Sequence, residues 1–440
     1  MIANIVIILA TVFLMYYRSL DYGYIIDDED KVTNVAKFKP KNKLQYIYWH
    51  YKGVIYADNR LAHLFNILVH MSVCSLIYMV FGHNNLSFLT AMLFAVNPVN
   101  NQVSVWLAGK HYGVATGLAL LAYWLVPLSP VFFYMALYTS TNVIFFPLIF
   151  LFKYPIITVI LLPIIYLLRR RFAPVIKDRI NVSTDSMTGF NAWKIILYFK
   201  TLGYYFVHCL FPIHIGMFHE YLHTYGLTDT ETKSWHKVDR FFFIGIALIL
   251  YTLYSIVYVQ DITTFGLVWF ILFSSQWCNV LMLNHPITER YIYFPNVGLM
   301  LALSSLIINT PLVYIFMTAY IVRLYYFLPA YRNMATYWRS QIREFPNVAL
   351  GYNQLGLALL NFGNHGSALD EWIQGVQRRD NDFRLNYNLS NILIGSGHIE
   401  PGVKFLKKAE ENLSDKNERE FWQDKINILK DAAREKGATI

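Results

Sequence analysis

The sequence predicts an all-α protein in which a multi-pass membrane domain, residues 1–330, precedes a soluble helical domain, residues 331–440. Three observations carry this prediction. The 440-residue chain is 56% hydrophobic and only 15% charged, which is typical of a protein that has lipid as its main solvent. Long apolar runs recur as far as Leu328. Beyond them, the pattern changes to amphipathic helices that repeat every 34 residues.

The apolar runs predict about 11 membrane spans, because a helix needs about 20 apolar residues to cross a bilayer. Several runs are shorter, so we expect tilted helices. The predicted spans are Ile2–Tyr17, Leu61–Phe81, Leu86–Val96, Gly113–Val126, Pro130–Leu137, Val143–Phe152, Pro155–Leu168, Phe241–Tyr258, Phe265–Val280, Ile292–Asn309 and Pro311–Leu328. The apolar stretch Trp193–Phe211 ends in Pro212 and a histidine-rich segment, so we interpret it as re-entrant or lying along the membrane surface.

The net charge of +9 comes almost entirely from the membrane domain. This placement favours phosphate-bearing lipid as a partner and argues against nucleic acid, which would need a basic soluble surface. Two basic clusters stand out, Lys31–Lys43 and Arg169–Arg171, and the positive-inside rule would make both cytoplasmic. The three cysteines, Cys74, Cys209 and Cys278, lie far apart in apolar runs and predict buried thiols.

Four consecutive carboxylates, Asp27 to Asp30, follow the first apolar run within the segment Tyr24–Asp30. Acids this close to a membrane helix are costly to bury and easy to place at the water interface. Adjacent carboxylates also repel, which can leave one of them as a proton acceptor. The spacing alone is equally compatible with a site at the bilayer edge and with a solvated acidic turn.

A zinc-protease pattern, HExxH, is present at His219-Glu220-Tyr221-Leu222-His223. On a helix, the two histidines would share a face and bind zinc, with Glu220 as the base. No third ligand is evident, and Gly216 and Gly226 leave room for only a short helix. Ordinary interfacial histidines are the alternative, and we predict no metal site.

Two further segments combine polar and apolar residues in ways that suggest a binding site. Glu289-Arg290-Tyr291 opens a predicted membrane helix, where an arginine can bind phosphate and a tyrosine suits the headgroup layer. The alternative is an interfacial anchor with an internal Glu289–Arg290 pair. The polar break Asn97–Gln102, which leads to Lys110, lies between two apolar runs.

Non-helical backbone at membrane depth is tolerated only against protein or a wet cavity. Asn97, Asn100 and Gln102 are therefore candidates for a cavity wall, with Lys110 facing an anionic substrate; a plain loop is the alternative. His63, Asn66 and His70 lie at helical spacing and predict one inward-facing polar stripe, for which hydrogen bonds between helices are the more probable role.

The 34-residue repeat in the C-terminal domain has tetratricopeptide spacing. Five positions recur 34 residues later: Leu355, Leu359, Gly363, Ala368 and Trp372 become Leu389, Leu393, Gly397, Gly402 and Leu406. Trp338 and Pro346 mark an earlier half-repeat. About two and a half repeats are therefore predicted, followed by a capping helix at Glu418–Ala433.

The order of these segments along the chain resembles that of the transmembrane and tetratricopeptide-repeat O-mannosyltransferase family. This family belongs to the GT-C class of multi-pass glycosyltransferases. The resemblance covers nearly the whole chain, and its most specific part is the Glu-Arg-Tyr segment joined to the repeats. The residues that carry it are Tyr24–Asp28, His63, Asn66, His70, Leu93–Val99, Gly109-Lys110, Leu210–Pro212, Glu289–Pro295, Tyr331–Asn333, Trp338 and Pro346.

The resemblance implies a GT-C-like fold, a polyprenyl- or dolichyl-phosphate sugar as co-substrate, and a protein acceptor near the repeats. It also implies integral placement in a bacterial inner membrane or the endoplasmic reticulum, with site and repeats on the non-cytoplasmic side. The family's acidic pair corresponds to Asp27 and Asp28, one of which would be the base. Arg290, Lys110 and Tyr291 would bind the donor phosphate, while His63, His219 and Glu220 would join the amides in the cavity wall.

The chain departs from the family at several charged or titratable positions. Asn97, Asn100 and Gln102 replace a His-Pro-x-His-x-Glu pattern, and Ser140-Thr141-Asn142 replaces Ser-Lys-Glu. An amide forms hydrogen bonds but cannot shuttle a proton, so a degenerate scaffold that binds partners through its repeats is a second hypothesis, and the zinc protease is a third. The implied external location of the basic clusters also conflicts with the positive-inside rule, unless those charges serve phosphate binding.

Overall fold

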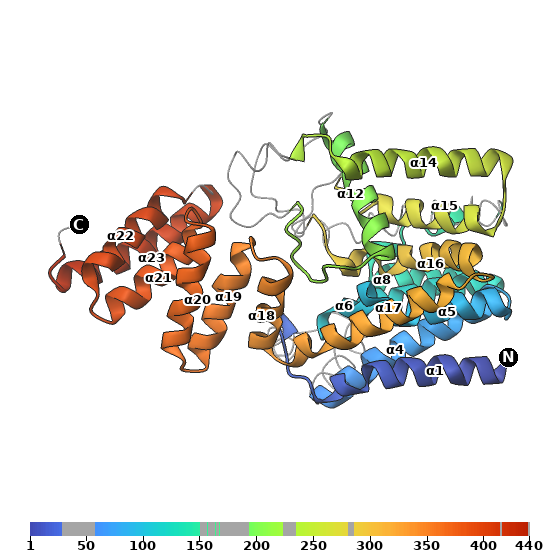
Figure 1. Ribbon diagram of the computed structural model, residues 1–440, viewed down its shortest axis with the longest axis horizontal. Helices are drawn as coiled ribbons and strands as arrows, with labels where there is room; N and C mark the ends of the chain where they lie inside the picture. Colours follow the sequence, from blue (N-terminus) through green and yellow to red (C-terminus); the bar gives the residue numbers. More distant parts are fainter. Residues whose placement is uncertain are drawn as a thin grey trace.

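The computed structural model describes residues 1–28, 58–149, 193–222, 235–279, 286–413 and 416–438, with the isolated positions 156, 163 and 167. These residues form α-helices, 3-10 helices and connecting turns, and none of them belongs to a strand, which confirms the all-α prediction. The apolar helices run side by side in one bundle, and the C-terminal helices extend from one end of it (Figure 1).

Four helical segments in the described residues are long and apolar enough to cross a membrane. They are α1 (Ile2–Tyr16) with η1 (Tyr17–Asp21), α4 (Asn59–Val80), α14 (Arg240–Tyr258), and α17 (Leu312–Phe327) with η8 (Leu328–Arg332). Their surfaces are largely exposed. Only 22% of the apolar 18-residue stretch in α1 and η1 is buried inside the protein, compared with 44% of the corresponding stretch in α4. Apolar surface of this kind favours a lipid environment.

The remaining apolar helices are shorter than a full span. They are α5 (Asn85–Val96), α7 (Lys110–Trp124), η4 (Val126–Leu128) with α8 (Ser129–Thr139), α15 (Ile262–Ser275) and α16 (Tyr293–Ile307). The 12 residues of α5 extend about 18 Å at 1.5 Å per residue, well short of a hydrocarbon core of about 30 Å. The count of about 11 spans therefore stays a prediction; Pro155–Leu168 and the end of Val143–Phe152 lie outside the described ranges.

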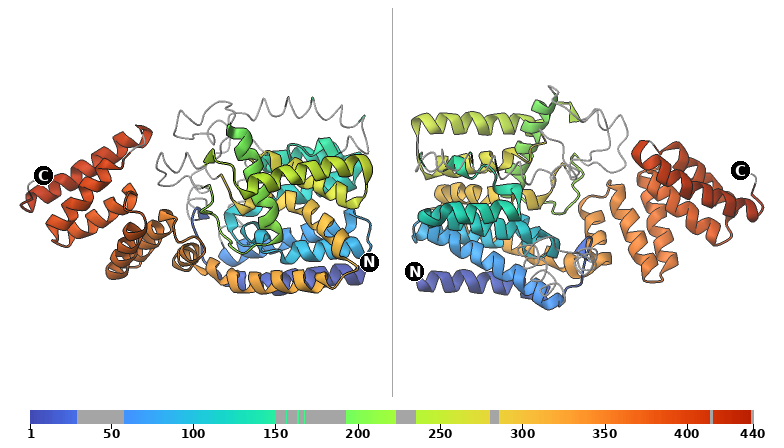
Figure 2. Two further views of the ribbon diagram at one scale, coloured as in Figure 1. Left: turned by 45° about the horizontal axis from the view of Figure 1, so that its top comes forward. Right: turned by 180° about the vertical axis from the view of Figure 1, so that it is seen from behind.

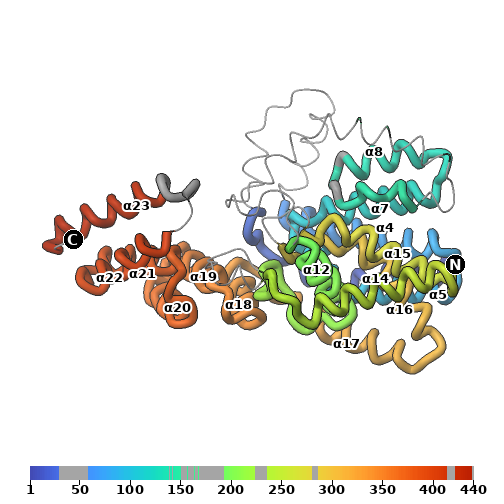
Figure 3. The backbone as a smooth tube through the Cα atoms, turned by 90° about the horizontal axis from the view of Figure 1, so that it is seen from above, coloured from blue at the N-terminus to red at the C-terminus, as the bar shows by residue number. Residues whose placement is uncertain are grey.

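Glycines allow two helix pairs to pack with their backbones close together. The stretch predicted to be re-entrant forms α12 (Trp193–Leu210), a continuous helix that packs along α14. A Cβ at Gly203 would lie 2.0 Å from the Phe241 carbonyl oxygen, and one at Gly245 would lie 2.1 Å from that of Phe199. Gly266 of α15 and Gly298 of α16 form a similar contact. Figure 3 shows α7 and α8 on one flank of the bundle and α17 on the opposite flank.

The predicted polar break is confirmed, because helix α5 ends where Asn97 begins a series of short turns. These are η2 (Pro98–Asn100), α6 (Asn101–Ser104) and η3 (Leu107–Gly109), after which α7 begins. The Asn97 side chain caps the first turn by accepting the Val99 N–H at 3.0 Å. All of these turn residues are buried, so the non-helical backbone lies against protein.

The described residues after η8 form an array of six helices: α18 (Met334–Glu344), α19 (Ala349–Asn361), α20 (His365–Arg378), α21 (Phe383–Gly395), α22 (Ile399–Glu411) and α23 (Lys416–Glu435). Positions 34 residues apart occupy equivalent places. Gly363 and Gly397 both end a helix with positive φ, at 75° and 88°, which favours glycine. Trp372 and Leu406 are both buried between helices. The repeated helix pairs are therefore real, and their classification as tetratricopeptide repeats stays a prediction.

Turn η8 and the first C-terminal helix, α18, dock at the end of the bundle that carries the acidic loop, which contains Asp27 and Asp28. The Gly23 N–H donates to the Arg332 carbonyl at 2.9 Å, and the Met217 N–H donates to the Gln341 side chain at 3.2 Å. The chain's N-terminus lies at the opposite end of the bundle (Figure 2). The acidic loop and the helical array therefore share one end, as the proposed site requires.

Candidate functional site

Glu289 is the centre of a polar cluster at this end of the bundle. It lies in η7 (Glu289–Ile292), immediately before α16, and its side chain is fully buried. Its carboxylate accepts the Gly216 N–H at 2.8 Å, the Asn101 amide at 3.0 Å and the Gln102 amide at 3.2 Å. A buried carboxylate needs such donors to be stable.

Two histidines complete the cluster. His208 Nε2 lies 3.2 Å and His219 Nε2 lies 3.6 Å from Glu289 Oε1. Burial would raise the pKa of the Glu289 carboxyl, but the two histidines beside it outweigh burial and hold that pKa below its ordinary 4.5. Burial in turn lowers the pKa of His219, whose Nδ1 lies 2.8 Å from the Tyr204 hydroxyl.

Arg290 does not pair with its neighbour Glu289. Its guanidinium donates to the Thr288 hydroxyl at 2.8 Å and lies 5.4 Å from the Trp106 ring centroid and 5.1 Å from that of Tyr291. Within the described residues, it makes no ion pair with a carboxylate, although only 8% of the residue is exposed. The alternative interpretation, an internal Glu289–Arg290 pair, is therefore contradicted, and Arg290 is a buried cation without a carboxylate partner among those residues.

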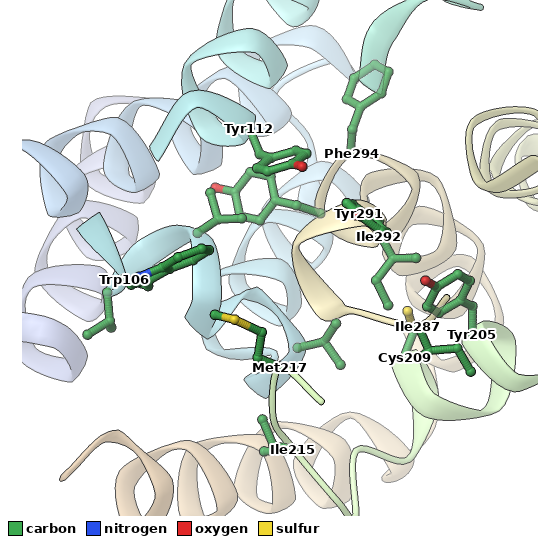
Figure 4. Packing of buried hydrophobic residues seen from close by; sticks show 14 of the residues in the cluster. Trp106, Tyr112, Tyr205, Cys209, Ile215, Met217, Ile287, Tyr291, Ile292 and Phe294 are labelled. Atoms are coloured by element: carbon green, nitrogen blue, oxygen red, sulfur yellow. The ribbon is translucent and has the colours of Figure 1, made fainter. Parts of the chain in front are cut away.

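Aromatic rings from several segments surround Arg290. Figure 4 shows Trp106, Tyr112, Met217 and Tyr291 gathered in one region between the polar break, α7 and η7. Tyr291 stacks on Trp277 with ring centroids 4.2 Å apart and an interplanar angle of 8°. Tyr291 is thus held by packing, and Arg290 has a rigid aromatic frame.

The two predicted acids differ in environment. Asp28 is buried, and its carboxylate accepts the Ile25 N–H at 3.1 Å and the Ala108 N–H at 3.0 Å. Asp27 is exposed. The turn around Ala108 joins Asp28 to Arg290, because the adjacent Trp106 contacts the guanidinium. Glu29, Asp30 and both basic clusters, Lys31–Lys43 and Arg169–Arg171, lie outside the described ranges.

The other predicted polar residues lie on α4 and at the start of α7. Lys110 Nζ is 5.6 Å from the Phe65 ring centroid. His63, Asn66 and His70 are all buried, which confirms the inward-facing stripe. The Asn66 amide donates to the Trp106 carbonyl at 3.0 Å, and His70 Nδ1 lies 2.7 Å from the Tyr293 hydroxyl. The stripe therefore links helices, as expected.

The predicted cavity-wall amides are used in packing. The Asn97 amide donates to the Cys209 carbonyl at 3.0 Å, and the Asn100 amide donates to the Phe94 carbonyl at 2.7 Å. Gln102 contacts the Glu289 cluster at both ends of its amide, since its oxygen accepts the Thr288 hydroxyl at 3.1 Å. Asn97 and Asn100 thus fix the polar break, while Gln102 belongs to the site.

The structure contradicts the helix that the HExxH pattern requires. Residues 211–222 form bends and turns, and His223 lies outside the described ranges. His219 is directed toward Glu289, whereas Glu220 is exposed and accepts the Asn347 amide at 2.7 Å. These adjacent side chains thus point in different directions, one into the cluster and one toward the C-terminal array. Sequence analysis missed His208, because a single histidine near the end of an apolar helix carries no motif.

In comparisons with known proteins, no family model matches the chain, and neither a curated protein nor a solved structure matches it significantly.

Proposed function

We propose that this protein is a membrane glycosyltransferase that moves a sugar, mannose or a similar one, from a polyprenyl- or dolichyl-phosphate carrier to a protein hydroxyl. The observation that carries the proposal is Arg290, a buried guanidinium without a carboxylate partner in the described residues, held in an aromatic frame at one end of an apolar bundle. A buried charge needs a counter-charge, and a lipid phosphate delivered from the bilayer fits that need.

The proposed chemistry is one inverting displacement. The acceptor hydroxyl oxygen attacks the anomeric carbon, the bond from that carbon to the carrier phosphate oxygen breaks, and the hydroxyl proton passes to a carboxylate. The leaving phosphate keeps the electron pair, and Arg290 would stabilise its charge together with Lys110. Tyr291 would position the donor through its stacked ring.

The two acids receive different roles in this proposal. Asp27 is exposed at the site end of the bundle and is the proposed base. Asp28 is the positioning residue, because the hydrogen bond that it accepts from the Ala108 N–H holds the acidic loop against the turn that carries Trp106, while the one from the Ile25 N–H fixes the loop itself. The C-terminal helices begin at the same end, so the acceptor protein would be presented there, on the non-cytoplasmic side.

The test is sugar transfer by purified protein in lipid nanodiscs. The donor is radiolabelled polyprenyl-phosphate mannose, and the acceptor is a serine- and threonine-rich peptide. We expect Asp27→Asn to abolish transfer without changing the melting temperature, while Asp21→Asn, an exposed acid paired with Arg60, leaves transfer intact. Undiminished transfer by Asp27→Asn would refute the assigned role.

A degenerate binding scaffold is the second candidate. Two observations favour it: Asn97 and Asn100 serve packing, and the carboxylate of Asp28 accepts two backbone N–H groups. This candidate predicts that wild-type protein binds the lipid phosphate without turnover and copurifies with a stable protein partner. Transfer above the level of the Asp27→Asn variant would exclude it.

A further inference from the structure

The cluster of His208, His219 and Glu289 has the composition of a metal-binding site. One ligand atom from each residue lies within 4.8 Å of the other two, and all three side chains are buried. The three residues come from separate segments: α12, the 211–222 segment and η7. Two imidazoles with one carboxylate form a donor set that is typical of zinc and related divalent metals.

Two of the three separations between ligand atoms fit a tetrahedral ion. Ligand bonds of about 2.0–2.1 Å place neighbouring ligand atoms of a tetrahedron about 3.3 Å apart. The distances from Glu289 Oε1 to the two Nε2 atoms, 3.2 Å for His208 and 3.6 Å for His219, bracket that value. No large rearrangement of the side chains is therefore required along these two edges.

An independent observation also points to a ligand. His219 Nε2 is buried and lies 3.6 Å from Glu289 Oε1, which is too long for a hydrogen bond; it has no hydrogen-bond partner among the residues that the structure describes. Its other nitrogen, Nδ1, lies 2.8 Å from the Tyr204 hydroxyl. In a metal complex the proton would sit on Nδ1 and face the Tyr204 oxygen, which leaves the Nε2 lone pair for the ion.

The surrounding contacts would orient the ligands. Glu289 Oε2 is fixed by the amides of Asn101 and Gln102, so Oε1 is held toward the histidines. Metal-binding carboxylates and imidazoles are commonly positioned by such outer hydrogen bonds. Gly216, in the same segment as His219, allows the Gln341 side chain of α18 to pack closely, because a Cβ at this position would lie 2.3 Å from that side chain. The cluster and the docking contact of α18 thus share the 211–222 segment.

We propose that His208, His219 and Glu289 bind one Zn²⁺-class divalent ion, which ties the 211–222 segment to the membrane bundle. The ion would hold in place the segment on which the C-terminal array docks, through Met217 and Gln341. This role is independent of sugar transfer. The same donor set does not make a protease, since Glu220 lies outside it.

The test is metal binding by the full-length chain, purified in detergent through a peptide tag without histidines and stripped with a chelator. After Zn²⁺ is added and excess removed, we expect about one zinc per chain by mass spectrometry and a higher melting temperature. Glu289→Gln and His208→Asn should lose both effects. His70→Asn is the matched control, because His70 is also buried but lies outside the cluster, and it should keep them.

Tyr204→Phe provides a graded test that leaves all three ligands in place. Loss of one outer hydrogen bond should weaken zinc binding by about 10- to 100-fold without abolishing it. A monodisperse wild-type chain that takes up no zinc would overturn the proposal. The cluster would then be only a network of hydrogen bonds. Equal zinc content in His208→Asn, His70→Asn and wild type would also overturn it, since binding would then lie elsewhere.

Discussion

Replacing Arg290 by Met distinguishes the effect of its buried charge on folding stability from its effect on ligand binding. In the absence of ligand, the substitution removes a hydrogen bond to Thr288 and contacts with two aromatic rings. Hydrogen bonds to charged groups contribute about 1.5–3 kcal/mol, and cation–π contacts about 0.5–2 kcal/mol each. Burying the guanidinium costs several kcal/mol, which Met does not incur. We therefore expect the unfolding free energy to change by only about 1 kcal/mol.

Ligand binding should respond very differently. A lipid phosphate at 100 times its dissociation constant stabilises wild-type protein by about 2.7 kcal/mol. Arg290→Met should lose most of that gain. The assay is thermal unfolding in detergent, monitored by intrinsic fluorescence, with and without polyprenyl phosphate.

Arg323→Met is the control, because Arg323 pairs with Glu344 at 2.7 Å. Loss of that pair leaves a largely buried carboxylate, so we expect lower stability with an unchanged response to the lipid. Two results would refute the reasoning. One is a loss of 3 kcal/mol or more in ligand-free Arg290→Met, which would mean that the guanidinium has an anionic protein partner. The other is an undiminished lipid response in this variant.

Three other predictions follow from burial and packing. The pKa of Glu289 in the folded protein lies below its ordinary 4.5, so its carboxylate stabilises the protein above about pH 4.5. This contribution is lost as the pH falls through the folded pKa. In a plot of melting temperature against pH, Glu289→Gln should therefore show a smaller fall at acid pH. Gly245→Ala should destabilise the α12–α14 contact by about 1–3 kcal/mol, whereas Gly117→Ala, which meets Val73 at 3.6 Å, should be tolerated in the same melting assay. Trp372→Ala should cost about 3–5 kcal/mol in the C-terminal array, because its ring is buried against Gly356 and its indole N–H donates to the Asn353 carbonyl; circular dichroism would show a weaker, earlier transition, and an unchanged transition would contradict this packing.

Much of the helical architecture could be predicted from local patterns. Long apolar runs gave α1, α4, α14 and α17, and the 34-residue spacing placed Gly363 and Gly397 at equivalent helix ends. Such features depend on nearby residues, which a sequence displays directly. The polar break after α5 followed from Asn97-Pro98, because proline cannot continue the helix at that point.

The composition of the site could be predicted only in part. Asp28, Gln102 and Arg290 were identified by their placement at helix ends, and they do share one end of the bundle. The sequence could not show that Glu289 turns from Arg290 toward His208, since these residues are 81 positions apart and meet only through tertiary packing. Likewise, the HExxH letters suggested a helix, while the backbone around Gly216 adopts an irregular path set by its contacts with Gln341 and Glu344.

Binding of a lipid-carrier phosphate by Arg290 can be measured by native mass spectrometry. Wild-type protein, Arg290→Met and Arg18→Met would each be released from detergent with equimolar polyprenyl phosphate. Arg18 lies at the same end of the bundle and contacts the Tyr325 hydroxyl at 3.2 Å. We expect one bound lipid phosphate on wild type and Arg18→Met, and little on Arg290→Met. Equal occupancy on all three proteins would contradict it.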